Sequence, residues 1–277
     1  MRSNELSSFQ KKISELNKHY SHFLFISEQF IIDHQSLFEN KPELYTSEVE
    51  IFNKNRFSKQ FNSQLKELIG ETEETKSFIL RSLFLLSYFQ FEVYLREIYN
   101  FARKYIASLP ELLGKTSILN QVKQNLELKK INELELVTLD YINLRRNALV
   151  HRDPSRAYQR AIADSIKTNG KKLNKYWKSS SLEIQSLDFT KKEIENFDSL
   201  EVIDILNILR RSAEQVDSFV LSEIGQDNLI KYLIEEFEKK YDKPIDQKKL
   251  VKKFKHFARI FLGAIMEDEE VVQLLEK

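Results

Sequence analysis

The side chains best suited to chemistry in this sequence gather in the stretch LRRNALVHRD, residues 144–153. Histidine changes its charge near neutral pH, so it can give or accept a proton during a reaction. Arginine presents a fork of N–H donors that matches a phosphate group. His151 is therefore a candidate general acid or base, and Arg146 is a candidate anion ligand. Of the five histidines in the chain, His151 alone stands in such a setting.

A helix must position these residues, because the apolar residues before His151 recur at helical spacing. Successive residues of an α-helix are about 100° apart, so Asp140, Asn143, Asn147 and His151 share one face and form a polar stripe. An unpaired buried polar group costs about 1–3 kcal/mol. The stripe therefore predicts an internal hydrogen-bond network, a partner subunit or a binding site. The rest of the helix is apolar, with Leu134, Leu136, Leu139, Ile142, Leu144, Ala148, Leu149 and Val150.

The spacing of arginine and histidine is by itself a weak signal. The helix dipole favours arginine and histidine in the last turns of any helix. A chain with five histidines is also expected to contain an arginine four to six positions before one of them about once by chance. The signal lies in the combination of an arginine, a polar residue, an aliphatic residue and a histidine on an apolar helix, with basic residues beyond it.

Other kinds of chemistry find no support in the sequence. Cysteine is absent, which removes disulfides and thiolate metal sites. His19 and His22 are three residues apart, but no third ligand lies near them, so the histidines show no zinc-like pairing. No glycine-rich phosphate loop and no GxSxG segment occurs. We therefore expect neither a metal ion nor another cofactor.

The composition favours an all-α protein. The 277 residues include only five glycines and four prolines, which is little of the turn punctuation that β-sandwiches and barrels need. The most apolar window, residues 78–95, contains Arg81, Gln90 and Glu92, whereas a membrane span needs about 20 nearly uncharged residues. We interpret it as a buried helix, without membrane contact. The lack of cysteine and of an N-terminal apolar leader makes a cytoplasmic location the simplest expectation.

Apolar periodicity predicts three successive parts of the chain. Residues 1–70 form an N-terminal helical extension, residues 71–225 the main helical domain, and residues 226–277 a helical tail. Gly70 and the segment TNGKK are interpreted as breaks between helices. Helices are expected from residue 6 towards Pro42, over about 47–68, 73–110, 116–126, 134–151, 155–166 and 199–224, and from about residues 227, 246 and 268, with 181–189 as a short strand or extended loop.

Basic residues follow the motif closely. Residues 145–178 contain ten lysines or arginines against two aspartates, although the net charge of the chain is only +1. Aromatic residues interleaved with basic ones are typical of RNA-binding surfaces, and Tyr158, Tyr176 and Trp177 are interleaved here. The alternative is a solvated face whose acidic partners come from elsewhere in the fold. The candidate RNA contacts are Arg152, Arg156, Arg160, Lys171 and Lys172.

The segment RNALVH resembles the signature of HEPN domains, an all-α family whose motif is an arginine, four to six residues and a histidine. Asn, Asp or His often follows the arginine in that family, and Arg146, Asn147 and His151 match this order. The resemblance covers residues 73–224. Glu92, in FQFEVYLREI, resembles the acidic residue that many members carry on an earlier central helix. One subgroup has a tyrosine two residues after the histidine, where this chain has Asp153, so that subgroup is not indicated.

The resemblance implies an antiparallel helical bundle that dimerises and brings two motifs together in a cleft. It also implies RNA cleavage without a metal ion, which leaves a 2′,3′-cyclic phosphate. His151 would take the proton of a ribose 2′-hydroxyl or protonate the leaving 5′-oxygen. Arg146 would hold the phosphate and stabilise the charge of the transition state, while Asn147 would orient the imidazole or bind the substrate.

Four further residues are candidates for a supporting role. Asp140 and Asn143 extend the polar stripe, Arg145 would add electrostatic attraction, and Glu92 would pair with an arginine of the site. For Glu92 the alternative is a purely structural pair with Arg96 on its own helix.

Two alternatives to a nuclease are also compatible with the sequence. Members of the family occur in toxin–antitoxin pairs and antiviral defence, so the implied partners are an RNA substrate, a second copy of the chain, and an antitoxin or defence-system protein. Non-catalytic members also exist, and a dimeric module that binds RNA or a partner protein would explain the basic stretch equally well. In the last reading RNALVH is a coincidence in an unrelated helical protein.

Overall fold

The computed structural model describes residues 1–58, 60–114, 116–128, 130–151, 156–182, 184–241 and 246–275. Within these ranges the regular structure consists of helices α1–α10 and two single-turn 3₁₀ helices, with no strand beyond one isolated bridge between Tyr45 and Gln64. The expectation of an all-α protein is confirmed. Residues 184–189, for which a short strand was one prediction, form part of a loop.

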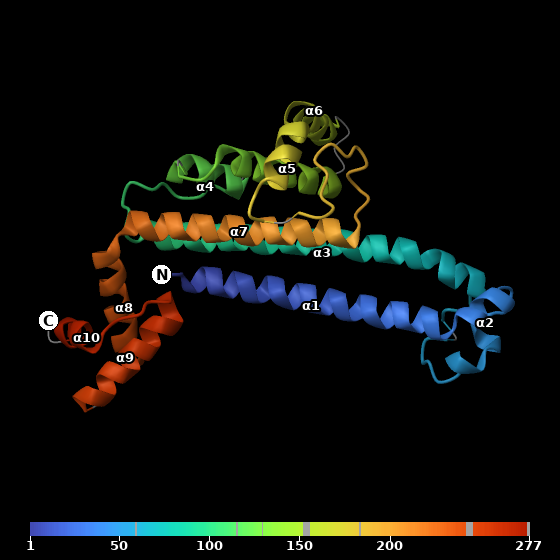
Figure 1. The fold of residues 1–277 in the computed structure, drawn as a ribbon, viewed down its shortest axis with the longest axis horizontal. Helices are drawn as coiled ribbons and strands as arrows, with labels where there is room; N and C mark the ends of the chain where they lie inside the picture. Colours follow the sequence, from blue (N-terminus) through green and yellow to red (C-terminus); the bar gives the residue numbers. More distant parts are fainter. Residues whose placement is uncertain are drawn as a thin grey trace.

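Three long helices form the centre of the molecule: α1 (Asn4–Asp33), α3 (Leu65–Arg103) and α7 (Ser199–Ile224). Figure 1 shows α3 and α7 side by side and running in the same direction, with α1 antiparallel to both. Aromatic contacts hold α1 to α3, since the Phe9 ring lies 5.3 Å from Tyr94 and 6.0 Å from Phe91. The Tyr94 hydroxyl reaches across to α7 and donates to the Ala213 carbonyl at 2.8 Å.

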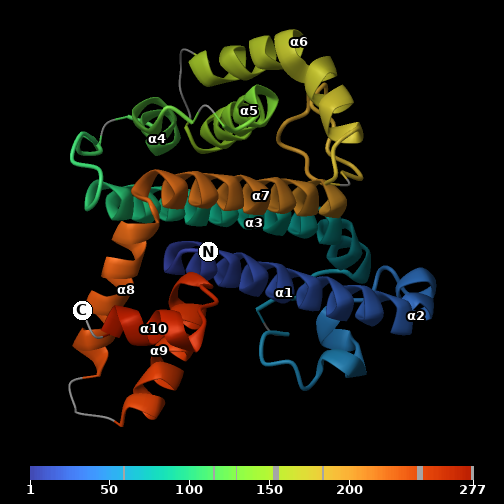
Figure 2. The ribbon, with the colours of Figure 1, turned by 60° about the vertical axis from the view of Figure 1, so that its left-hand side comes forward.

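A second layer covers one side of α3 and α7 (Figure 2). Because α3 and α7 are parallel, the chain must return along their length between them, and this connection carries the second layer. The layer is tied together by buried polar contacts, such as the Trp177 indole N–H that donates to the Thr138 hydroxyl at 2.9 Å. Its helices are α4 (Ile118–Leu126), α5 (Glu133–Val150) and α6 (Ala157–Lys178).

The tail closes the end of the bundle where the chain begins. The Arg2 amide donates to the Leu262 carbonyl at 2.7 Å, and the Ser3 amide donates to the Asp217 carboxylate at 3.0 Å. The buried apolar side chains of the first helix, the central helices and the tail belong to one continuous cluster, so the three predicted parts share a core. The tail helices, α8 (Gln226–Lys240), α9 (Gln247–Leu262) and α10 (Asp268–Leu275), begin close to the predicted positions.

The prediction of a helix over residues 47–68 was wrong. The short helix α2 (Gln35–Asn40) is followed by the 3₁₀ turns η1 (Thr46–Glu48) and η2 (Glu50–Phe52). Phe57 and Phe61, which lie within the range predicted as a helix, are 44% and 67% exposed. Helix α3 then starts at Leu65 and continues through Gly70, because an exposed glycine inside a helix costs only about 1 kcal/mol. The helix therefore crosses the boundary predicted at residue 70.

The segment TNGKK was predicted as a turn, yet α6 continues through it to Lys178. Its glycine serves tertiary packing: a Cβ atom on Gly170 would lie 2.6 Å from the Phe189 carbonyl oxygen. The missing side chain lets the loop before α7 cross the helix at close range. Ser155, the first residue of the helix predicted over 155–166, lies outside the described residues.

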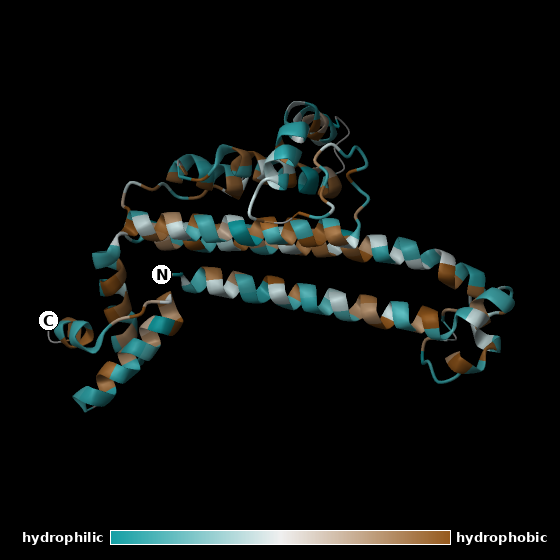
Figure 3. Ribbon diagram, viewed as in Figure 1, coloured by the Kyte–Doolittle hydropathy of each residue, from teal (hydrophilic) through white to brown (hydrophobic). Residues whose placement is uncertain are grey.

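Helix α3 has one buried side and one exposed side, although its most apolar window, residues 78–95, was interpreted as a buried helix. Phe78, Leu86 and Phe89 are 67%, 50% and 53% exposed. By length and composition α3 is the one described helix that could cross a membrane, which is weak evidence since 44% of its most apolar window is buried in the bundle. Figure 3 shows polar and apolar residues interspersed along all three long helices.

Candidate functional site

The motif lies where α5 ends. Val150 is the last helical residue, and the His151 amide still donates to the Asn147 carbonyl at 2.9 Å. The backbone of His151 is extended, with φ −96° and ψ 111°, so the chain leaves the helix at this residue. The imidazole is exposed and stacks on Tyr158 of α6, with 5.3 Å between ring centroids and 26° between the planes. A histidine placed in this way can exchange protons with solvent or a ligand.

Arg146, Asn147 and His151 line the same pocket, which has a volume of about 690 Å³. Glu92 of α3 and Asn143 of α5 line it too, so five of the predicted site residues meet although Glu92 comes from a distant part of the sequence. The remaining walls are Phe89, Val93 and Arg96 of α3, Gly114, Thr116, Ser117 and Ile118 of the following loop and α4, and Tyr158 of α6.

The guanidinium of Arg146 is held on two sides. One nitrogen donates to the Asn147 side-chain oxygen at 2.8 Å, and another lies 3.6 Å from the Glu92 carboxylate. The ring of Tyr88 supports it, with 5.9 Å from the guanidinium carbon to the ring centroid. A guanidinium has five N–H donors, so several remain for an anionic ligand in the pocket.

Two side chains of α3, Glu92 and Tyr88, lie against the guanidinium of Arg146. Burial raises the pKa of the Glu92 carboxyl, and the positive charges of Arg146 and Arg96 oppose that shift. Burial, with the Glu92 charge as the second cause, raises the pKa of the Tyr88 hydroxyl, which has no hydrogen-bond partner among the described residues. The Arg146 pair shows that Glu92 contacts the motif and does more than pair along its own helix. Tyr88 was not predicted, although its place one turn before Glu92 was a usable signal.

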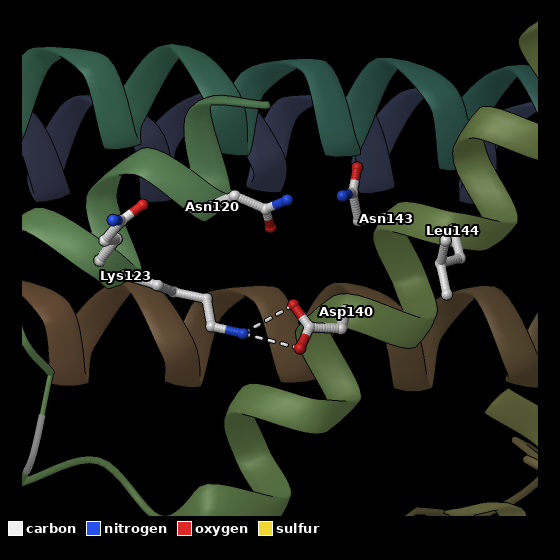
Figure 4. A pocket seen from close by; sticks show the side chains of 6 residues that line it. Asn120, Lys123, Asp140, Asn143 and Leu144 are labelled. Atoms are coloured by element: carbon white, nitrogen blue, oxygen red, sulfur yellow. Dashed lines mark hydrogen bonds and ion pairs between the residues drawn. The ribbon is translucent and has the colours of Figure 1, made fainter. Parts of the chain in front are cut away.

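The polar stripe of α5 continues past this pocket. The Asn147 amide donates to the Asn143 side-chain oxygen at 3.3 Å, and Asn143 donates to the Ser117 hydroxyl at 3.4 Å. Asn143 also lines a second pocket, of about 520 Å³, between α4 and α5. There the Lys123 ammonium donates to both oxygens of Asp140 at 2.7 Å (Figure 4). Asp140 therefore lies in the neighbouring pocket. Its partner Lys123 was not predicted, because Lys123 belongs to α4 and the residue spacing on α5 says nothing about another helix.

Arg145 was expected to add electrostatic attraction for the substrate, and this expectation was wrong. Its side chain is fully buried, its guanidinium pairs with Glu201 of α7, and its Nε donates to the Ile194 carbonyl at 2.8 Å. The guanidinium also lies 3.9 Å from the centroid of the Phe197 ring. Arg145 points into the bundle because it is about 100° around the helix from Arg146. It anchors the loop before α7 to α5.

The basic surface is smaller than the sequence suggested but persists on α6. Arg156, Arg160, Lys171 and Lys172 are exposed, whereas Arg152 lies outside the described residues, as does Asp153. Trp177, predicted as a stacking surface, is buried at 2% exposure. The Tyr176 hydroxyl donates to the Glu135 carboxylate at 2.7 Å. Of the three interleaved aromatic residues, Tyr158 is the one that lines the pocket.

Comparisons with known proteins found no relative of this chain. No protein-family model, curated protein or solved structure matches the chain. Within the described part of the chain, no three histidine, aspartate or glutamate side chains gather into a group that could hold a metal ion.

Proposed function

We propose that this protein is a metal-independent endoribonuclease of the HEPN type, which cleaves RNA by general acid–base catalysis. The observation that carries the proposal is the convergence of Arg146, Asn147 and His151 on one open pocket, with the imidazole exposed. These polar side chains share a helix that is otherwise largely buried, and a structural role alone would not require them to face an open pocket.

The residues of the pocket suit the steps of the reaction. His151 takes the proton of a ribose 2′-hydroxyl, whose oxygen then attacks the adjacent phosphorus. The bond from phosphorus to the 5′-oxygen breaks, that oxygen takes a proton from water, and the product ends in a 2′,3′-cyclic phosphate. Arg146 donates to the phosphate oxygens as their charge increases. The Asn147 side-chain oxygen accepts a hydrogen bond of 2.8 Å from Arg146 and so holds the guanidinium in place.

A second copy of the chain would complete this site. The exposed apolar side chains of α3 lie on one face, because Phe78 and Phe89 are eleven residues apart and Leu86 is three residues before Phe89. Phe89 also lines the pocket. We infer that a second α3 covers this face, which would shield the apolar side chains from water and bring two pockets together.

The exposed lysines and arginines of α6 would guide RNA to the pocket, since Tyr158 at the start of α6 stacks on His151. The motif resemblance further suggests a toxin or antiviral defence effector in the cytoplasm, restrained by an antitoxin or another defence-system protein.

The second candidate function is a non-catalytic dimeric module that binds RNA or a partner protein. The observation that favours it is the ion pair between Arg146 and Glu92, which partly neutralises the arginine in the free chain. The basic face of α6 would still bind RNA in that case.

The test is cleavage of end-labelled RNA in the presence of EDTA. The parent protein should cut, and His151→Ala and Arg146→Ala should each lose at least about 100-fold in rate. His19→Ala is the matched control, because His19 is an exposed histidine on α1, a helix that contributes no residue to the lining of the pocket, and its activity should equal that of the parent. Cleavage that survives His151→Ala would refute the proposal, and RNA binding without cleavage would favour the module.

A further inference from the structure

The proposed reaction leaves half of the polar stripe on α5 without a role. Asp140 and Asn143 line the second pocket together with Asn120, Lys123 and Gln124, all of which carry hydrogen-bonding side chains. Asn120 and Gln124 are exposed, and the one apolar lining residue is Leu144. Figure 4 shows Asn120, Asn143 and the Lys123–Asp140 pair around the same space. Such a lining is suited to a small planar ligand with several donors and acceptors.

We propose that this second pocket binds a guanine base of the RNA, next to the nucleotide that is cleaved. The inference rests on the proposed function, since it assigns a base to the site beside the catalytic pocket.

The two pockets adjoin closely enough for neighbouring nucleotides. Asn143 lines both of them, and its side-chain oxygen accepts from Asn147 of the catalytic pocket at 3.3 Å. Asp140 and Arg146 lie on the same helix, six residues and therefore about 9 Å apart along its axis. With a phosphate at Arg146, a base attached beside it can enter the space between α4 and α5.

The choice of guanine follows from its hydrogen-bonding edge. Guanine presents two adjacent donors, N1–H and the N2 amino group, beside the O6 acceptor, and a carboxylate offers two acceptor oxygens side by side. Asp140 can accept from both donors while Lys123 donates to O6. Adenine, cytosine and uracil present a single donor group on this edge, so none of them uses both carboxylate oxygens together with the ammonium.

The ion pair between Lys123 and Asp140 is compatible with a ligand that separates the two groups. Both side chains keep contact with water, at 21% and 40% exposure, and pairs of this kind contribute little to stability. Lys123 has a flexible stem, so its ammonium can move from the carboxylate to a nearby acceptor. In the free chain the two groups satisfy each other, and the base would take over both contacts.

The test measures equilibrium binding of short RNAs to the full-length chain with His151→Ala, which keeps the RNA intact. Hexamers of uridine are compared with hexamers that contain one guanosine, adenosine or cytidine. The guanosine oligomer should bind at least about tenfold more tightly than the others. Adding Asp140→Asn should abolish this preference and favour adenosine, because an amide presents one acceptor and one donor.

A matched control is Glu223→Gln, which makes the same change in another lysine–carboxylate pair, that of Lys130 and Glu223 at 3.5 Å. This control should keep the guanine preference, and thermal melting of both variants checks that they fold. Equal affinity for all four oligomers, absence of binding, or a guanine preference that survives Asp140→Asn would each overturn the inference. Cleavage by the parent protein in EDTA is measured separately, so failure of the guanine pocket is distinguishable from failure of the proposed reaction.

Discussion

Mutation of the two adjacent arginines of the motif should affect different properties, namely stability for Arg145→Ala and RNA cleavage for Arg146→Ala. Arg145 is fully buried, and Arg145→Ala would leave Glu201, at 1% side-chain exposure, without its main partner. Breaking a buried pair on one side typically costs about 3–5 kcal/mol. We expect the lower part of that range, because the Lys191 ammonium still donates to Glu201 at 2.8 Å. A loss of about 3 kcal/mol is a large part of the stability of an ordinary domain.

Arg146→Ala should change stability far less. Its pair with Glu92 is 3.6 Å long, and both side chains keep some contact with solvent, at 26% and 19% exposure. Pairs that retain this contact with water contribute about 0–1 kcal/mol. The same substitution should nevertheless abolish RNA cleavage, since the proposed phosphate ligand is lost.

The assay is urea unfolding of the parent and the two variants at neutral pH, followed by circular dichroism. Arg145→Ala should lower the midpoint strongly with little change in slope, and Arg146→Ala should unfold close to the parent. Equal destabilisation by both substitutions, or a larger effect of Arg146→Ala, would refute the assignment of one arginine to the core and the other to the pocket.

Three further predictions concern other parts of the fold. Gly170→Ala should destabilise the protein by about 1–3 kcal/mol because its Cβ would lie 2.6 Å from the Phe189 carbonyl oxygen. Gly70→Ala, whose Cβ would have nothing within 4 Å, should stabilise the protein by about 1 kcal/mol. An unchanged melting temperature for both variants would contradict these assignments. Burial raises the pKa of the Asp217 carboxyl, so the folded state favours the protonated form of this group. The resulting contribution to stability is fully present below the unfolded pKa near 4 and is lost as the pH rises through the raised value. The stability of Asp217→Asn relative to the parent should therefore increase as the pH is raised from about 4 in denaturant titrations, and a constant difference would argue against the shift. Phe89→Glu should convert a dimer into a monomer in sedimentation experiments, because the exposed ring lies on the proposed interface, and a parent protein that is already monomeric would remove that part of the proposal.

The helical class and several helix bounds could be predicted from local sequence. The long helix predicted over 199–224 is observed as α7, Ser199–Ile224, because the Asp198 side chain caps its first turn by accepting from the Glu201 amide and Gly225 follows its end. Such signals act within a few residues of the chain. They failed at Gly70 and Gly170, where a glycine inside a helix was interpreted as a break. At Gly170 the reason for the glycine lies in the neighbouring loop at Phe189, and at Gly70 an exposed glycine costs too little to end the helix.

The core of the candidate site was also predictable, since Arg146, Asn147 and His151 lie within six residues on the last turns of one helix. Helical geometry places Asn147 and His151 on one face. Arg146 lies about 140° around the helix axis from His151, so only the folded chain shows that both line the same pocket. Glu92 was found through the motif resemblance, and its pair with Arg146 appears only in the folded chain. Lys123 gave no signal, because nothing near it in the sequence indicates that α4 lies beside α5.

The sequence by itself determined that the chain is helical and that one helix ends in a group of side chains suited to acid–base chemistry on a phosphate. Only the tertiary structure decided which of the two neighbouring arginines serves that group. Helix periodicity states the angle between Arg145 and Arg146, but the direction of the core is set by the packing of α5 on α6 and α7. The same packing buries Arg145 against Glu201 and leaves Arg146 and His151 at the pocket.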